Sequence, residues 1–126
     1  MIYKELIDNI ENRVGKFKSK GNIRMIKILE HFDNPCDSMK FIHIAGTNGK
    51  GSTSYFLYEI LKSKFKVGFY TSPGLTSYRD RIVVGDLRIS QSEFLSIGEE
   101  ILEKEKLILD RHGELNKFEF LTTIAF

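Results

Sequence analysis

The chain has 126 residues, of which 41% are hydrophobic and 29% are charged, so its composition is that of a single globular domain and excludes a disordered or fibrous protein. The 19 basic residues nearly balance 17 acidic ones, and the net charge of +2 gives no reason to expect nucleic acid or an anionic membrane as a partner. No apolar run reaches the roughly 20 residues of a membrane-spanning helix. The N-terminus lacks a signal-peptide core and Cys36 is the one cysteine, so we expect a cytoplasmic protein.

Two amphipathic helices are expected in the first third of the chain. Apolar residues recur at helical spacing from Ile2 to Val14 and again from Asn22 to Phe32, and Asn34-Pro35 ends the second helix. The stretch Gly15 to Gly21 between them holds three lysines and is either a solvated loop or a place where an anionic substrate lies. The second helix is expected to bury Ile23, Ile26 and Leu29 on one face.

The stretch from Lys40 to Thr53, K-F-I-H-I-A-G-T-N-G-K-G-S-T, is the most informative in the chain. Phe41 to Ala45 predicts a short buried strand, Gly46 to Gly51 a glycine-rich turn, and Ser52 to Lys64 a helix. Glycines let backbone N–H groups approach an anion closely, and the N-terminus of the helix attracts negative charge. Because Lys50 adds a positive charge at the same point, the stretch predicts a phosphate-binding loop.

This loop departs from the common G-x-x-x-x-G-K-[ST] pattern at two positions. Ile44 stands where the first glycine is usual, and Gly51 replaces the Ser or Thr that normally follows the lysine. The alternative is an ordinary strand-to-helix turn that happens to be rich in glycine. The apolar strand before the turn favours the phosphate loop, because this is the context that the motif requires.

A second strand, Lys66 to Tyr70, is expected to lie parallel to the first, which gives a β-α-β unit in a doubly wound sheet. The helix between the strands would cover that sheet with Phe56, Leu57, Ile60 and Leu61. Ligands bind beyond the C-terminal ends of such strands, so Ser72 would emerge beside the phosphate loop. Ser72 is therefore a candidate metal ligand that replaces the missing hydroxyl at Gly51. Alternatively, Thr71 to Pro73 only form a turn.

The last third of the chain predicts a hairpin and two helices. Arg81 to Ile89 alternates as two short strands around Gly85-Asp86, and Ser90 begins a capping box for a long helix that Gly113 closes. Inward residues of that helix are expected to be Phe94, Ile97, Ile101, Leu102 and Leu109. Phe118 to Phe126 begins a strongly apolar helix. An apolar element at the last residue is a poor end for a domain, so we expect the chain to be part of a longer one.

Five stretches resemble the folylpolyglutamate and dihydrofolate synthases, a branch of the Mur ligase superfamily. The run from His43 to Thr53 matches the ATP loop of that family, in which a glycine separates the lysine from the hydroxyl residue. The other matches are Tyr70-Thr71-Ser72-Pro73, the continuation Tyr78, Asp80, Arg81 and Ile82, the segment Phe118-Glu119-Phe120 and, in part, Asn22-Ile23-Arg24. Gly74 departs from the family, which usually has a histidine there.

The resemblance implies an ATP-dependent ligase that joins L-glutamate to folate or dihydropteroate through an acyl phosphate. ATP would be held by Thr47, Asn48, Gly49, Lys50, Gly51 and Ser52, with Lys50 as the catalytic residue. Ser72 would ligate Mg²⁺, and Phe118 and Glu119 would touch the pterin, as would the loop at Lys18 to Lys20. Residues 73 to 82 would form a loop that covers folate.

By the same resemblance the chain would be the N-terminal part of a P-loop, doubly wound, mostly parallel ATP-binding domain. Residues 1–39 would be leading helices and residues 40–126 an incomplete core, without the C-terminal glutamate-binding domain, and the chain alone would be inactive. The family suggests a monomer. Peptidoglycan-precursor ligases usually place Ser or Thr after the lysine, so Gly51 argues against them. A phosphotransferase, a nucleotide-regulated module and a fragment without ligand affinity remain alternatives.

Overall fold

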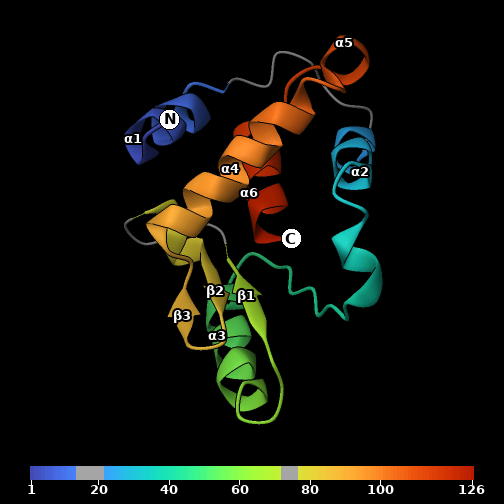
Figure 1. Cartoon of the computed structure of the whole chain (residues 1–126). Helices are drawn as coiled ribbons and strands as arrows, with labels where there is room; N and C mark the ends of the chain where they lie inside the picture. The colour runs from blue at the N-terminus through green and yellow to red at the C-terminus, as the bar shows by residue number, and fades with distance from the viewer. Residues whose placement is uncertain (14–21, 72–76) are drawn as a thin grey trace. The chain divides into compact units, whose positions relative to one another are not determined.

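The computed structural model describes residues 1–13, 22–71 and 77–126, which form two compact units. One unit combines residues 1–39 and 91–126, and the other is residues 40–90. The helices and strands labelled in Figure 1 are α1 (Tyr3–Glu11), α2 (Ile23–Glu30), α3 (Lys50–Leu61), β1 (Gly68–Tyr70), β2 (Ile82–Val84), β3 (Leu87–Arg88), α4 (Gln91–Glu105), α5 (Leu109–His112) and α6 (Lys117–Ala125). Two short 3₁₀ helices are η1 (Pro35–Ser38) and η2 (Tyr78–Arg81). The described chain contains both helices and a sheet, in agreement with the predicted α/β class.

The unit of residues 1–39 and 91–126 is helical, with α1, α2, α4 and α6 packed around one apolar core. The predicted first helix is confirmed as α1, which buries Leu6 and Ile10 one turn apart. The predicted long helix is confirmed as α4. Core side chains with no exposed surface are Leu6, Ile10, Ile28, Phe94, Ile101, Leu115 and Phe120.

The close contact between α1 and α4 depends on Gly98. A Cβ atom at Gly98 would lie 2.5 Å from Leu6 Cδ2, and Leu6 is fully buried, so its side chain has little room to move away. We expect Gly98→Ala to lower the free energy of unfolding by about 1–3 kcal/mol, as overpacked cores do. Urea denaturation measures this loss.

The matched control for that substitution is Ser96→Ala, on the exposed side of the same helix. Alanine favours the helix there and meets no core, so the control should unfold within about 0.5 kcal/mol of the wild type. If both variants unfold at the same urea concentration, Gly98 does not limit the approach of α1 to α4.

The prediction for the buried face of α2 is wrong. Ile23 and Ile26 are 37% and 50% exposed, whereas Arg24 and Ile28 are buried. The cause is an ion pair, because Arg24 Nε donates to Glu119 Oε2 at 3.1 Å and so carries a charge into the interior. A buried charge is tolerated when it is paired and hydrogen-bonded.

The unit of residues 40–90 contains α3 and a three-stranded antiparallel sheet in the order β1-β2-β3. Gly68 pairs with Val84 and Tyr70 with Ile82, and β2 turns into β3 through the two residues Gly85-Asp86. The predicted hairpin is thus confirmed. Gly85 has a φ of 63°, a conformation that favours glycine in such turns.

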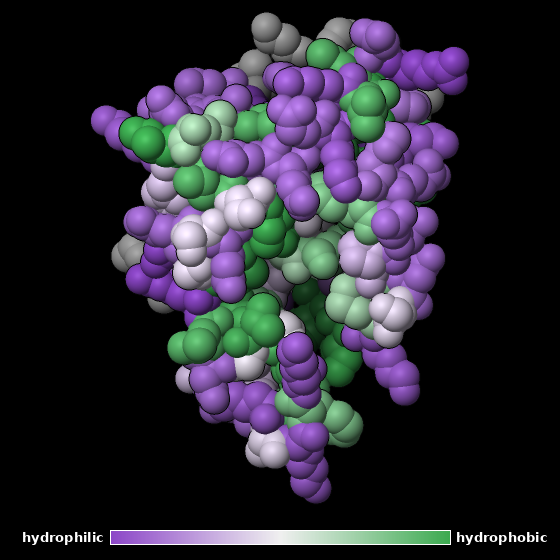
Figure 2. Space-filling model, viewed as in Figure 1, coloured by the Kyte–Doolittle hydropathy of each residue, from purple (hydrophilic) through white to green (hydrophobic). Residues whose placement is uncertain are grey.

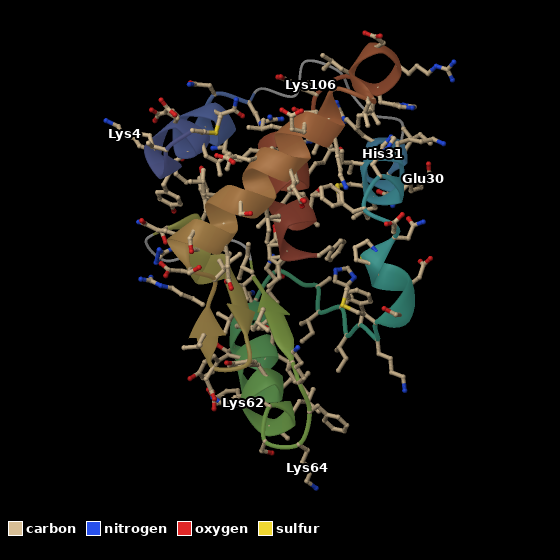
Figure 3. The ribbon with its side chains drawn as sticks, in the orientation of Figure 1. Lys4, Glu30, His31, Lys62, Lys64 and Lys106 are labelled. Atoms are coloured by element: carbon tan, nitrogen blue, oxygen red, sulfur yellow. The ribbon has the colours of Figure 1, made fainter. Side chains whose placement is uncertain are left out.

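The C-terminal half of α3 is fixed to the hairpin turn. The Tyr58 ring stacks on Phe69 with 4.9 Å between centroids, and its hydroxyl donates to the carbonyl of Gly85. Lys62, labelled in Figure 3, lies 3.0 Å from Glu59 and from Asp86, and its hydrogen bonds to these carboxylates raise its pKa. The helix that begins at the predicted phosphate loop is therefore anchored at its far end.

The residues that the structure describes do not form the predicted parallel β-α-β unit, and β1 pairs antiparallel with β2. Residues 41–45 form no strand, and Phe41 and Ile42 are 56% and 65% exposed instead of buried. The predicted apolar stripe on α3 is also exposed at Phe56 and Ile60. A strand needs a hydrogen-bonded neighbour, and the described chain offers none to residues 41–45. Figure 2 shows green hydrophobic areas among the purple surface.

The remaining helices differ from their predictions mainly at their ends. Gly113, with a φ of 75°, follows the short helix α5 and not the long helix α4, which ends at Glu105. Leu109, expected inside, is 47% exposed. The last helix is confirmed as α6. No helix within residues 1–13, 22–71 and 77–126 is long and apolar enough to cross a membrane.

Candidate functional site

The N-terminus of α3 presents backbone donors that no side chain caps. Gly49 is the N-cap residue, has a φ of 75° and offers no side-chain acceptor. Thr53 N donates to the Gly49 carbonyl at 2.9 Å, and the N–H groups of Lys50, Gly51 and Ser52 come before this first helical hydrogen bond. An uncapped helix N-terminus beside a lysine is suited to bind an anion.

The structure brings together all of the residues predicted to bind nucleotide. Thr47, Asn48 and Gly49 form the turn, Lys50, Gly51 and Ser52 form the first turn of α3, and all of them are exposed. A Cβ atom at Gly51 would meet nothing within 4 Å, so contacts inside the chain do not require glycine there. The glycine leaves space at the helix N-terminus.

The predicted metal ligand, Ser72, lies outside the described residues, as do the lysines of residues 14–21. Within the described ranges no group of three or more His, Cys, Asp or Glu side chains is arranged to hold a metal ion. The metal prediction therefore rests on the sequence.

The predicted substrate residues Phe118 and Glu119 differ in their surroundings. Phe118 is 59% exposed in the first turn of α6, whereas Glu119 is buried. The Glu119 carboxylate accepts from Asn116 N at 3.2 Å and from Arg24 Nε at 3.1 Å, while Asn116 Oδ1 accepts from Glu119 N at 2.8 Å. Phe118 is thus the side chain with free surface, and Glu119 fixes the start of its helix.

A second buried ion pair, which the sequence did not suggest, holds the segment before α6. Arg13 donates to both oxygens of Glu105 at 2.6 and 2.9 Å and to the Leu115 carbonyl at 2.9 Å, while Leu115 N donates to Glu105 at 2.7 Å. The guanidinium also lies 4.4 Å from the centroid of the Phe120 ring. The partners are 92 residues apart, so no local pattern signals them.

Backbone and side-chain bonds join the ends of the predicted folate-covering loop. Thr71 N donates to the Arg81 carbonyl at 3.0 Å, and Asp80 accepts from Ser77 N at 3.0 Å and from Arg88 at 2.6 Å. The Arg81 guanidinium lies over the Tyr78 ring, 5.2 Å from its centroid. The carboxylate of Asp80 is therefore occupied, and Arg81 has an aromatic ring as its neighbour.

Comparison with known proteins assigns the chain to a family. No family model matches it. It is 36% identical over 107 residues to dihydrofolate synthetase of Saccharomyces cerevisiae. The matched region covers 84% of this chain and 24% of the yeast protein. Folylpolyglutamate synthase of Thermotoga maritima superposes with a TM-score of 0.86 at 32% identity, covering 98% of this chain and 29% of that one. A folylpolyglutamate synthetase complex with AMPPCP and folate superposes with a TM-score of 0.90 at 26% identity, and the match covers 99% of this chain and 31% of that one.

The chain spans about a quarter of the curated relative's length and under a third of these solved structures. Similarity covers most of this chain in both the sequence and the structural comparisons, so it is not confined to the glycine-rich loop. By sequence and by fold, the chain belongs to the folylpolyglutamate and dihydrofolate synthase family.

Proposed function

We propose that this chain carries the ATP-binding part of a ligase that joins L-glutamate to folate or dihydropteroate. The observation that carries the proposal is the uncapped N-terminus of α3, where three backbone N–H groups and Lys50 lie together at an exposed glycine turn. The similarity to a complex that contains AMPPCP and folate supports the identity of both ligands. The reaction would pass through an acyl phosphate, which gives the substrate carboxylate a leaving group.

In this proposal Thr47 to Ser52 surround the phosphates of ATP. Their backbone N–H groups would donate to phosphate oxygens, and the space beside Gly51 would accommodate the phosphate chain. Lys50 would stabilise the negative charge on the phosphoryl group as it is transferred to the substrate carboxylate. Catalysis here would consist of positioning and electrostatic stabilisation by groups that are already in place.

Mg²⁺ and Ser72 complete the proposed site. Gly51 leaves the usual place of the metal-binding hydroxyl without an oxygen, and Ser72 is the proposed replacement. A bound Mg²⁺ would neutralise charge on the phosphates. Among the described residues, no group of three or more His, Cys, Asp or Glu side chains is arranged to add further metal ligands.

We further propose that in the complete enzyme residues 41–45 form a strand of the doubly wound parallel sheet of a P-loop domain. Phe41, Ile42 and the exposed residues of α3, Phe56 and Ile60, supply the apolar surface that such a sheet and its helix would bury. The chain would then be the N-terminal part of that domain in a cytoplasmic enzyme, with glutamate bound elsewhere and no turnover by these 126 residues alone.

The proposal is tested by following thermal unfolding of the purified chain against Mg-ATP and then against dihydropteroate. A ligand that binds only the native state must raise its unfolding temperature. Shifts with both ligands would support the ligase, whereas a shift with Mg-ATP alone would favour a general nucleotide-binding module. A cooperative transition that neither ligand shifts would contradict the proposal.

Alanine substitution should change ligand binding at Phe118 and folding stability at Glu119. Phe118 is exposed, so Phe118→Ala should leave stability within about 0.5 kcal/mol of the wild type and weaken dihydropteroate binding. Glu119→Ala removes the carboxylate that pairs with buried Arg24 and should cost about 3–5 kcal/mol of unfolding free energy. Urea denaturation and calorimetric titration measure the two effects. Unchanged binding by Phe118→Ala would remove this residue from the site.

A further inference from the structure

Arg81 is a charged residue with a hydrogen-bond donor that has no acceptor in the structure. Its Nε is buried, and it has no hydrogen-bond partner in the structure. The rest of the residue is half-buried at the end of η2, where its carbonyl accepts from Thr71 N. Buried donors are normally paired, so each unpaired one in a folded protein needs an explanation.

The acid next to Arg81 in the chain does not neutralise it. Asp80 accepts from Ser77 N at 3.0 Å and pairs with Arg88 at 2.6 Å, on the neighbouring hairpin. No ion pair of Arg81 with an acidic group is present among the described residues. The positive charge is therefore uncompensated within the described chain.

The position of Tyr78 indicates how an anion would approach. The Cζ atom of Arg81 lies over the Tyr78 ring, 5.2 Å from the ring centroid. A cation–π contact of this kind uses the face of the guanidinium and leaves its in-plane N–H donors available for hydrogen bonds. Donors in this fork arrangement fit two oxygens of one carboxylate or phosphoryl group.

We propose that Arg81 binds an oxyanion of a substrate, either the carboxylate of the pteroate or a phosphoryl group of the nucleotide. This inference rests on the proposed function and adds a binding residue to it. The segment between Thr71 and Arg81 is joined at its base, so the charge is held at one end of the predicted folate-covering loop. The bound oxyanion would supply the acceptor that Nε lacks.

The test compares Arg81→Gln with Arg79→Gln in the whole polypeptide that carries these residues. Both variants remove one positive charge from η2, and only the first removes the guanidinium stacked on Tyr78. Calorimetric titration gives the dissociation constants for dihydropteroate, for its carboxamide and for Mg-ATP. We expect Arg81→Gln to weaken one anionic ligand by about 10- to 100-fold, as the loss of a charged hydrogen bond does, with Arg79→Gln near wild type.

The three ligands separate the sources of the oxyanion. Weaker binding of dihydropteroate but not of the carboxamide would assign the carboxylate, and weaker binding of Mg-ATP alone would assign a phosphoryl group. If the wild type binds all three ligands and the dissociation constants of Arg81→Gln lie within twofold of the wild-type values, the inference is overturned and the proposed function stays intact. A wild type that binds none would overturn both.

A structural role for Arg81 predicts a different pattern. Because the buried Nε of Arg81 makes no hydrogen bond in the structure, ligand-free Arg81→Gln should unfold at the same temperature as the wild type or a higher one. Arg81→Lys retains the charge without the fork and should recover only part of the affinity. A lower unfolding temperature with equal weakening for the carboxamide and the acid would show that Arg81 supports the fold and would overturn the inference.

Discussion

Replacing Lys50 by alanine is expected to abolish most of the proposed ligase activity of the polypeptide that carries this chain. Lys50 is the one side-chain charge in the run of residues proposed to hold the ATP phosphates, and it begins α3, where the helix N-terminus already attracts anions. Loss of one preorganised group that stabilises transition-state charge typically reduces kcat about 10²- to 10³-fold. Mg-ATP binding should weaken as well, because in the proposed site the lysine would also contact phosphate in the ground state.

Lys64→Ala is the matched control for this substitution. Lys64 is an exposed lysine three residues past the C-terminal end of the same helix, and Figure 3 labels it. The control removes the same charge from the same unit, so it separates a local effect from a change in net charge. Steady-state kinetics and calorimetric titration with Mg-ATP compare the two. Equal Mg-ATP affinity in Lys50→Ala and Lys64→Ala would refute the phosphate loop.

The loop was predictable because the information lies in adjacent residues. Thr47 to Ser52 are contiguous, so the chain itself brings them together, and the glycines and Lys50 identify both the turn and the start of a helix. The sequence placed that start at Ser52, two residues after the observed one. Capping residues set helix ends, and Gly49 has no side chain whose chemistry could have signalled the N-cap.

The burial of Arg24 illustrates what a local pattern misses. Helical periodicity directs charged residues to solvent, so it predicts that Ile23 and Ile26 lie in the core. The partner that makes Arg24 buried is Glu119, 95 residues later, and Glu119 in turn is positioned by the cap at Asn116. Such a pair depends on how the helices of the unit pack, which hydrophobic spacing alone does not encode.

The sheet shows a related limit. An apolar run such as residues 41–45 has the composition of a buried strand, but a strand forms only where a neighbouring strand supplies hydrogen bonds. The turn at Gly85-Asp86 gives β2 and β3 each a neighbour within a few residues, so this hairpin was predictable from turn chemistry. The pairing of β1 with β2 spans η2 and was not.

The largest stability effect is expected at the Arg13–Glu105 pair. Arg13→Met keeps most of the side chain's length and apolar contact while leaving the Glu105 carboxylate buried without its counter-charge. Removing one partner of a buried pair typically costs about 3–5 kcal/mol, because the remaining charge loses water and partner together. The loss should appear as a lower urea midpoint for the cooperative unfolding of the polypeptide.

Two further variants decide whether the stability loss of Arg13→Met comes from the burial of the ion pair or from the loss of any ion pair. Lys117→Met breaks the pair with Glu11, whose atoms lie 3.0 Å apart as well but whose side chains are 42% and 51% exposed, so it should cost only about 0–1 kcal/mol. Adding Glu105→Gln to Arg13→Met removes the uncompensated charge, and the double variant should lose less than the sum of its single losses. If Arg13→Met costs no more than Lys117→Met, the buried pair does not hold Leu115 and the segment that leads into α6.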